Sequence, residues 1–138
     1  MNSKQLNIKF YQNVAKVFYA MAYVDNEIRE TEIRALKNIV KEEWVLLDET
    51  EDDFHTDGAY QIEVVFDWLQ SKDANAKISY KEFTEYYEDH PYFFTNSIKE
   101  LILKTAEKIA SAFAGKNKSE LIFLGNLSIL FRKEMGLV

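Results

Sequence analysis

Two short acidic stretches contain the residues of this chain whose types and spacing could bind a cation. The first runs from Ala22 to Glu32, and in it Asp25 and Asn26 form a predicted turn before Ile28. The turn brings Asp25 toward the start of the following helix, where Glu32 lies one helical turn in, so the two carboxylates can converge on one divalent cation. A structural alternative stays open. In it, Asp25 satisfies free backbone N–H groups and Glu32 stabilises the positive end of the helix dipole.

The second stretch runs from Ser71 to Phe83 and resembles the calcium-binding loop of an EF-hand. Its residues at the ligand positions are Ser71, Asp73, Asn75, the main chain of Lys77, Ser79 and the closing Glu82. Serine replaces the usual first aspartate and Ala76 replaces the glycine that permits the sharp turn, so any calcium affinity is expected to be weak. The alternative is a helix–loop–helix turn in which Ser79 caps the next helix and Glu82 completes a capping box.

A third acidic segment is the predicted loop from Asp48 to Asp57, which contains six carboxylates and no lysine or arginine. Its acidic residues are Asp48, Glu49, Glu51, Asp52, Asp53 and Asp57. We expect them either to form a surface that binds a basic partner or simply to solvate an exposed loop. Of the two histidines, His55 lies in this loop and could join a metal site there, whereas His90 precedes Pro91 and is expected to cap a helix end.

Charge and composition exclude several classes of function. The net charge is -6, and the segment from Glu42 to Asp89 has 15 acidic and 3 basic residues, so a cation or a basic protein surface suits this chain better than nucleic acid. The absence of cysteine excludes disulfides, thiolate zinc sites, iron–sulfur clusters and cysteine nucleophiles. No phosphate-binding glycine loop, nucleophile elbow or two-histidine metal motif is present. We therefore expect a non-enzymatic protein, with a catalytic carboxylate pair as the least favoured alternative.

The elements that would position these residues are helices. Only 4 glycines and 1 proline occur in 138 residues, and apolar residues recur at spacings of three and four. The pattern predicts a single all-α domain, residues 1–138, with about six helices near 4–22, 29–46, 58–70, 79–90, 96–114 and 119–134. The last of these is apolar on most sides, which predicts a place at the centre of the bundle. Without a signal peptide or a bilayer-length apolar run, we expect a cytoplasmic protein with no membrane insertion.

The stretch around Asp25 resembles the signature of the tellurite-resistance TerB-like family. In that family a helix ending in small residues meets an Asp-Gly turn, a hydrophobic residue and a glutamate that opens the next helix; Asn26 stands here where glycine is usual. The segment 112–121 is similar to the family's second unit, with Glu120 as the helix-opening glutamate but no aspartate and a shorter turn. The resemblance covers the two terminal helix pairs and not the middle of the chain.

The resemblance implies a compact helical bundle, an acidic patch that binds metal, and a stress-response or adaptor role. The missing second aspartate argues against a two-sided acidic metal site. Two functions are therefore expected. The first is a module for calcium or another divalent cation, with candidate ligands Asp25, Glu32, Asp73, Asn75 and Glu82. The second is a protein-interaction domain or homodimer whose acidic turns are structural, with an aromatic patch drawn from Tyr11, Tyr60, Tyr80, Tyr92 and Phe94.

Overall fold

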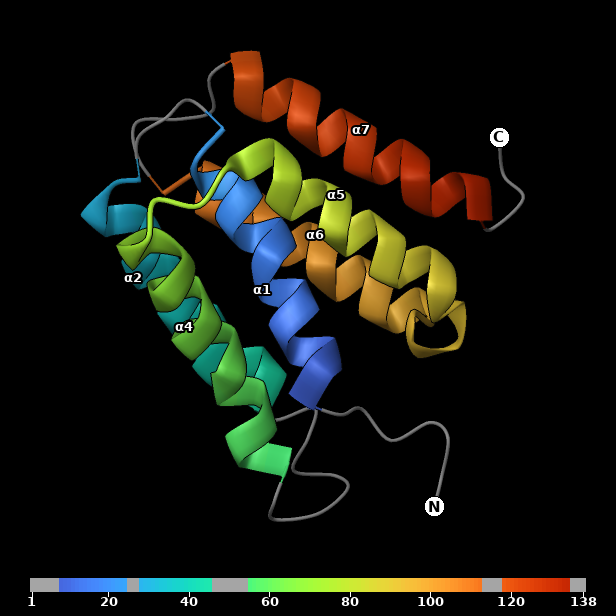
Figure 1. The fold of residues 1–138 in the computed structure, drawn as a ribbon, viewed down its shortest axis with the longest axis horizontal. Helices are drawn as coiled ribbons and strands as arrows, with labels where there is room; N and C mark the ends of the chain where they lie inside the picture. The colour runs from blue at the N-terminus through green and yellow to red at the C-terminus, as the bar shows by residue number, and fades with distance from the viewer. Residues whose placement is uncertain (1–7, 25–27, 46–54, 113–117, 135–138) are drawn as a thin grey trace.

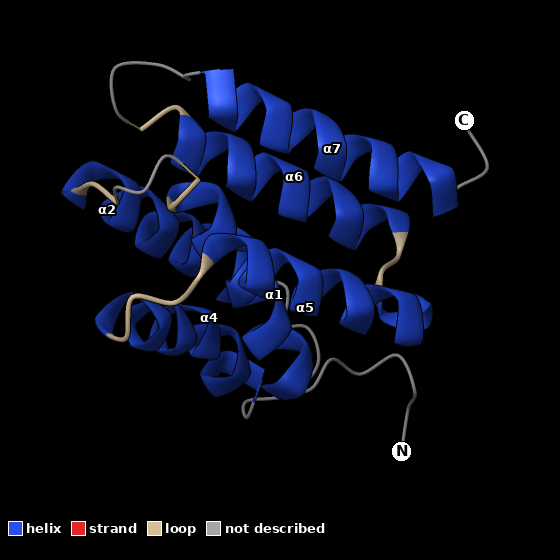
Figure 2. Cartoon of the chain, turned by 45° about the horizontal axis from the view of Figure 1, so that its top comes forward, coloured by secondary structure: helices blue, strands red, loops and turns tan. Residues whose placement is uncertain are grey.

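The computed structural model describes residues 8–24, 28–45, 55–112 and 118–134, which form a bundle of helices without a strand (Figures 1 and 2). The α-helices are α1 (Ile8–Ala22), α2 (Glu30–Ile39), α4 (His55–Ser71), α5 (Ala76–Asp89), α6 (Asn96–Ala110) and α7 (Lys118–Glu134). A π-helical turn, Val40–Trp44, continues α2, and a single 3₁₀ turn, Pro91–Phe93, joins α5 to α6. The predicted all-α bundle is confirmed. No helix in the described residues combines the length and the hydropathy needed to span a membrane.

The central helix of the bundle is α1. It packs against α4, α5, α6 and α7, and its side chains are buried from Phe10 to Ala22 except for Gln12 and Lys16. Burial on all sides is possible because Lys9 and Lys16 are the only charged residues in α1. The prediction that the C-terminal helix is central was therefore wrong.

Helix α7 instead lies at the side of the bundle, against α6, with a smaller contact to α1 (Figure 1). Leu127 and Phe131 are buried, whereas the opposite side of the helix faces solvent. Burial within the described residues therefore accounts for only one side of this apolar helix, and the other side is an exposed hydrophobic face.

Aromatic side chains of α1, α5 and α7, together with Phe94 just before α6, pack against one another. Phe83 lies at its centre and makes edge-to-face contacts with Phe94 and Phe131, with ring centroids 5.9 and 6.4 Å apart. Phe10 reaches the same group from α1, 5.4 Å from Phe94. Such buried ring pairs each add about 0.5–1.5 kcal/mol beyond area burial, so this cluster anchors three helices to one another.

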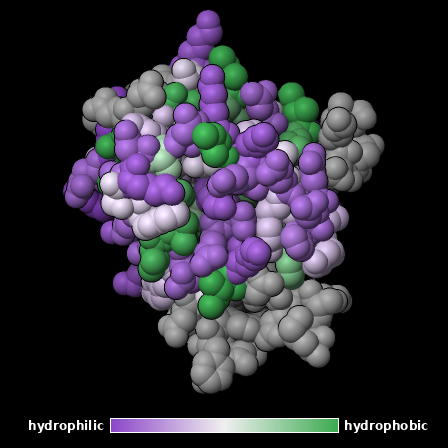
Figure 3. Space-filling model, viewed as in Figure 1, coloured by the Kyte–Doolittle hydropathy of each residue, from purple (hydrophilic) through white to green (hydrophobic). Residues whose placement is uncertain are grey.

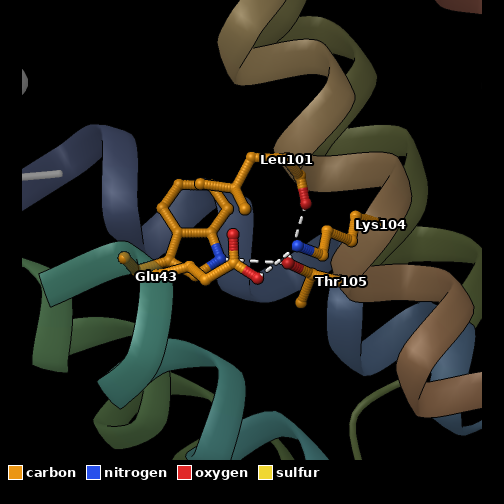
Figure 4. Close-up of polar contacts among 5 residues, drawn as sticks. Glu43, Leu101, Lys104 and Thr105 are labelled. Carbon is orange, nitrogen blue, oxygen red and sulfur yellow. Dashed lines mark hydrogen bonds and ion pairs between the residues drawn. The ribbon is translucent and has the colours of Figure 1, made fainter. Parts of the chain in front are cut away.

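Polar contacts join the π-helical turn to α6. The buried Trp44 indole N–H donates to Thr105 Oγ1 at 3.0 Å, and the Thr105 hydroxyl donates to the Leu101 carbonyl at 2.7 Å. Figure 4 shows these contacts beside the ion pair of Glu43 with Lys104. Trp44 is the last residue of the π-helical turn. Its indole ring is buried in the core, and its N–H has a hydrogen-bond acceptor there in Thr105.

Candidate functional site

Glu32, one of the candidate cation ligands, helps to cap the start of α2. Its carboxylate lies in the first turn of α2 and is 1% exposed. Glu32 Oε1 accepts a hydrogen bond from the Arg29 backbone N–H at 2.8 Å, which is the reciprocal half of a capping box. Asp25, its predicted partner, lies outside the described residues. Glu120 is likewise buried in the first turn of α7, so both helix-opening glutamates predicted from the sequence lie inside the fold.

The segment predicted as a degenerate calcium loop is a helix-ending turn held against α1. The Asp73 N–H donates to the Gln70 carbonyl at 3.1 Å and the Ala74 N–H to the Leu69 carbonyl at 3.0 Å, the two bonds of a Schellman motif. Asp73 occupies the left-handed position with φ 53°, which aspartate tolerates better than most residues. The Asp73 side chain turns back toward α1 instead of toward a loop centre.

Two tyrosines of α1 and its C-terminal end fix that turn. The Tyr19 hydroxyl donates to the Ala74 carbonyl at 2.8 Å, and the Tyr23 hydroxyl donates to Asp73 Oδ1. Burial raises the pKa of Tyr19 to about 12, with the nearby Tyr23 and Asp73 adding to the shift. The hydrogen bond to the Asp73 carboxylate raises the pKa of Tyr23 as well. Asp73 therefore already has a hydroxyl partner where the sequence suggested a metal ion.

The start of α5 differs from the prediction. Asn75 is the N-cap, and its Oδ1 accepts from the Ile78 N–H at 2.9 Å, so the helix begins at Ala76. Ser79 is buried one turn inside α5, and Glu82 forms an ion pair with Lys16 of α1 at 3.3 Å. The predicted capping box of Ser79 with Glu82 is wrong. Asparagine is as good an N-cap as serine, and capping at residue 75 instead of residue 79 adds about one helical turn.

The candidate ligands are thus distributed over separate contacts. Within the ranges that the structure describes, no group of three or more histidine, aspartate or glutamate side chains could hold a metal ion. Five of the acidic-loop residues lie outside these ranges: Asp48, Glu49, Glu51, Asp52 and Asp53. Asp57 lies in the first turn of α4, because this helix begins at His55 rather than after Gly58, and its side chain is not described. The cation site therefore stays a prediction.

The predicted aromatic patch does not form. Tyr11 and Phe94 are buried and Tyr80 is half-buried, whereas Tyr60 and Tyr92 are exposed on different helices. His90 ends α5 as predicted, with its ring stacked on Tyr86 at 4.3 Å between centroids. Buried aromatic residues here stabilise the core, which is their usual role.

The outer face of α4 presents a different group of apolar side chains. Tyr60, Val64 and Trp68 are 37, 56 and 54% exposed. Their spacing of four residues places them in one stripe, which we call the α4 stripe, while Ile62 and Phe66 point into the core. The spacing of four between Tyr60, Val64 and Trp68 is visible in the sequence, so this stripe could have been predicted, although it was not.

Two carboxylates and two lysines border the α4 stripe. Asp67 is exposed beside Val64 and Trp68 on the same helix face, and its carboxylate lies 3.9 Å from the Lys37 amine. Burial raises the pKa of Glu63, the neighbouring Asp67 raises it further, and Lys37 opposes both. Lys72 sits over the Trp68 ring, 4.0 Å from its centroid. No lysine or arginine occurs between Glu42 and Ser71 in the sequence, so α4 belongs to the most acidic part of the chain.

A surface hollow lies between α2 and the end of α6. It measures about 570 Å³, and it is lined by Ala35, Asn38, Ile39, Glu42, Glu107, Lys108, Ser111 and Ala112. Its two carboxylates, Glu42 and Glu107, are both exposed. Catalytic carboxylates are typically partly desolvated, whereas these two carboxylates are exposed to solvent.

Comparisons of the chain with protein-family models, with curated proteins and with solved structures find no match. The resemblance to the TerB-like family therefore stays a prediction. The function has to be argued from the geometry of the described residues.

Proposed function

We propose that this domain is a non-enzymatic protein-interaction module, and that α4 binds a basic amphipathic segment of its partner. The observation that carries the proposal is the α4 stripe, in which Tyr60, Val64 and Trp68 stand exposed in one line along an otherwise well-packed helix. Full burial of one large apolar side chain contributes about 1.5–3 kcal/mol, and nothing within the described fold provides it for these residues. Tryptophan and tyrosine are also the residues most enriched at the centres of protein interfaces.

The charge around the stripe defines the chemistry of the partner. Asp67 and Glu63 lie along one edge of the stripe, with Lys37 beside Asp67 and Lys72 over Trp68, and the sequence before them is strongly acidic. A partner helix with leucine or isoleucine on one face and lysine or arginine at its edges would bury the stripe and pair with these carboxylates. Like charges would oppose an acidic partner, so this surface discriminates by sign as well as by shape.

The ionisation of Glu63 gives the interaction a pH dependence. Because burial raises the pKa of Glu63 in the free domain, part of its negative charge is lost at a higher pH than for an ordinary glutamate. A lysine of the partner beside Glu63 would lower that pKa again. Binding is therefore expected to strengthen as the pH rises through the raised pKa of Glu63 and to weaken as the pH falls below it.

A fluorescence titration tests the proposal. Trp44 is fully buried, so a change in tryptophan emission on binding reports Trp68. The probe is a synthetic helical peptide with leucines spaced by four on one face and lysines elsewhere. We expect a saturable shift of emission to shorter wavelength, which Val64→Asp abolishes and Tyr92→Ser, at an exposed aromatic residue outside the stripe, leaves unchanged.

The matched control peptide has glutamate in place of every lysine. An equal response to both peptides would show non-specific hydrophobic binding and would overturn the charge argument. The absence of a saturable response to the basic peptide would overturn the proposal that α4 is the binding face.

A divalent-cation site at Asp25 and Glu32 is the second candidate, because Glu32 is a carboxylate buried at a helix start. Calorimetric titration of chelator-treated protein with Ca²⁺, Mg²⁺, Mn²⁺ and Zn²⁺ tests it. Saturable binding that Asp25→Ala removes would support a site there. Binding that Asp73→Ala or Glu82→Ala removes would instead place the site in the α4–α5 turn.

A further inference from the structure

Helix α7 carries a second exposed apolar stripe. Leu121, Ile122 and Ile129 are 55, 54 and 55% exposed and lie on the helix side away from the buried Leu127 and Phe131. They share this side with Gly125, and we call the four residues the α7 stripe. In the view of Figure 1, hydrophobic side chains reach a mostly hydrophilic surface in small groups over both α7 and α4 (Figure 3).

Gly125 makes a notch in the middle of the α7 stripe. A glycine in an exposed helix interior is unfavourable relative to alanine, because it gains no packing and loses more backbone freedom on folding. Nothing in this chain lies within 4 Å of a β-carbon built at Gly125, so the fold itself does not require a glycine there. Glycine between larger apolar residues instead forms a hole that can receive a large side chain from outside.

The α7 stripe has basic ends. Lys118 and Arg132 are exposed, seven residues before and after Gly125, and project from the same side of the helix. The α4 stripe has two carboxylates, Asp67 and Glu63, along one edge, with Lys37 beside Asp67 and Lys72 over the Trp68 ring. The α7 stripe therefore has the pattern that the α4 stripe requires of its partner: apolar residues along one face and positive charge at the edges.

The two stripes also match in length and in surface shape. Tyr60 to Trp68 and Leu121 to Ile129 each cover nine residues, and the eight steps between their ends correspond to about 12 Å of helix. Trp68 provides a protruding ring on one stripe, and Gly125 provides a hole on the other. A large aromatic residue packed into a pocket between apolar neighbours is the usual centre of a protein interface.

We propose that the α4 stripe binds the α7 stripe of a second copy of this chain. This inference rests on the proposed function and names its partner. Helices α4 and α7 lie on opposite sides of α1 and α5 (Figures 1 and 2), so one pair of copies cannot close both contacts at once. The contact is heterologous, so the copies assemble head to tail. An assembly of any length has one unpaired α4 stripe at one end and one unpaired α7 stripe at the other.

The expected assembly is weak and concentration-dependent. Three apolar side chains on one side and three with a glycine on the other suit the small, transient class of interface, below about 1,200 Å² in total. Dissociation constants in the range of about 10 µM to 1 mM are typical of such encounters. Salt should weaken the contact because its charged groups are at the exposed edges.

Sedimentation of the whole chain over that concentration range tests the proposal. We expect the average mass to rise with concentration for the wild type. Trp68→Glu removes the α4 stripe and Ile129→Glu removes the α7 stripe, so each variant alone should remain monomeric. Circular dichroism and thermal melting verify that both variants are folded, which is expected because both side chains are more than half exposed.

Mixing the two variants is the decisive step. Trp68→Glu keeps an intact α7 stripe and Ile129→Glu keeps an intact α4 stripe, so an equimolar mixture should form one-to-one dimers and nothing larger. A mixture that remains monomeric while the wild type associates would overturn pairing between α4 and α7 and would favour pairing of like stripes. A wild type that is monomeric throughout would overturn self-association itself, whereas binding of the basic peptide to α4 would still uphold the proposed function.

Gly125→Ala separates an interface role from a folding role. Alanine has open space at this position and a better helix propensity, so the melting temperature of the isolated domain should rise. The same β-carbon fills the notch, so the dissociation constant for self-association should increase at least tenfold. Unchanged association in Gly125→Ala would overturn the placement of Trp68 against the notch.

Discussion

The α4–α5 turn and the outer face of α4 are neighbours in the chain but use their residues in opposite ways. In the turn, polar side chains form intramolecular hydrogen bonds: Tyr19 and Tyr23 bind the segment 73–74, and Asn75 caps α5. On the outer face, apolar side chains point to solvent and leave the core to Ile62 and Phe66. The residues that look chemically active stabilise the fold, while residues of ordinary hydrophobic type supply the candidate binding surface.

The largest effect is expected for the left-handed residue of the turn. Asp73→Ala places a β-carbon without a compensating side-chain contact at φ 53°, whereas Asp73→Gly loses the same contact with Tyr23 but adopts that conformation freely. We expect Asp73→Ala to be less stable than Asp73→Gly by about 1–2 kcal/mol in urea unfolding. If the segment were a calcium loop, both variants would lose the same ligand, and equal stabilities would contradict the Schellman assignment.

The next effect concerns the buried tyrosine that holds the turn. The folded-state pKa of Tyr19 is raised to about 12, above the value of about 10 for a free tyrosine. Its contribution to stability is therefore complete below pH 10 and is lost as the pH rises toward 12. Tyr19→Phe should lose about 0.5–1.5 kcal/mol at neutral pH for the missing hydrogen bond to Ala74 and show a shallower fall in stability from pH 10 to 12.

Tyr86 provides the control for this titration. Burial raises its pKa to about 12 as well, so Tyr19→Phe should retain part of the alkaline destabilisation. The free energy of unfolding, measured by urea denaturation at several pH values, gives both slopes. Identical slopes for Tyr19→Phe and the wild type would show that Tyr19 ionises equally in the folded and unfolded states.

A smaller effect distinguishes the two possible caps of α5. Asn75→Ala removes the acceptor of the Ile78 N–H and should cost about 1 kcal/mol, as for other N-caps. Glu82→Ala removes only a partly exposed ion pair with Lys16 and should cost at most about 0.5 kcal/mol. Thermal unfolding of the two variants side by side tests the order. A larger loss of stability for Glu82→Ala than for Asn75→Ala would support the predicted capping box of Ser79 with Glu82.

The contrast between these regions explains which parts of the fold and of the candidate site could be predicted from the sequence. The spacing of apolar residues was sufficient for the helices, since Phe10, Val14 and Phe18 recur on one face as an amphipathic helix requires. The burial of α1 rather than α7 was not predictable, because apolar composition alone does not say whether a helix meets its own chain or another molecule. The sequence left a calcium loop and a capped turn open, because Asp73 and Asn75 are common to calcium loops, Schellman turns and N-caps. The hydrogen bonds from Tyr23 and Tyr19, 50 and 55 residues earlier in the chain, hold this segment as a turn against α1.

The smallest effect on stability is expected on the outer face, and it is also the most informative. Val64 is more than half exposed and has no described role in the core, so Val64→Asp should change the free energy of unfolding by less than about 0.5 kcal/mol while abolishing peptide binding and self-association. The matched core change, Ile62→Val on the inner face of the same helix, should cost about 0.5–1.5 kcal/mol and leave binding unchanged. If Val64→Asp destabilised the fold as much as Ile62→Val, the stripe would belong to the structure of the monomer. If Val64→Asp stays stable but does not bind, and Ile62→Val binds but is less stable, then the inner face of α4 stabilises the fold and its outer face binds the partner.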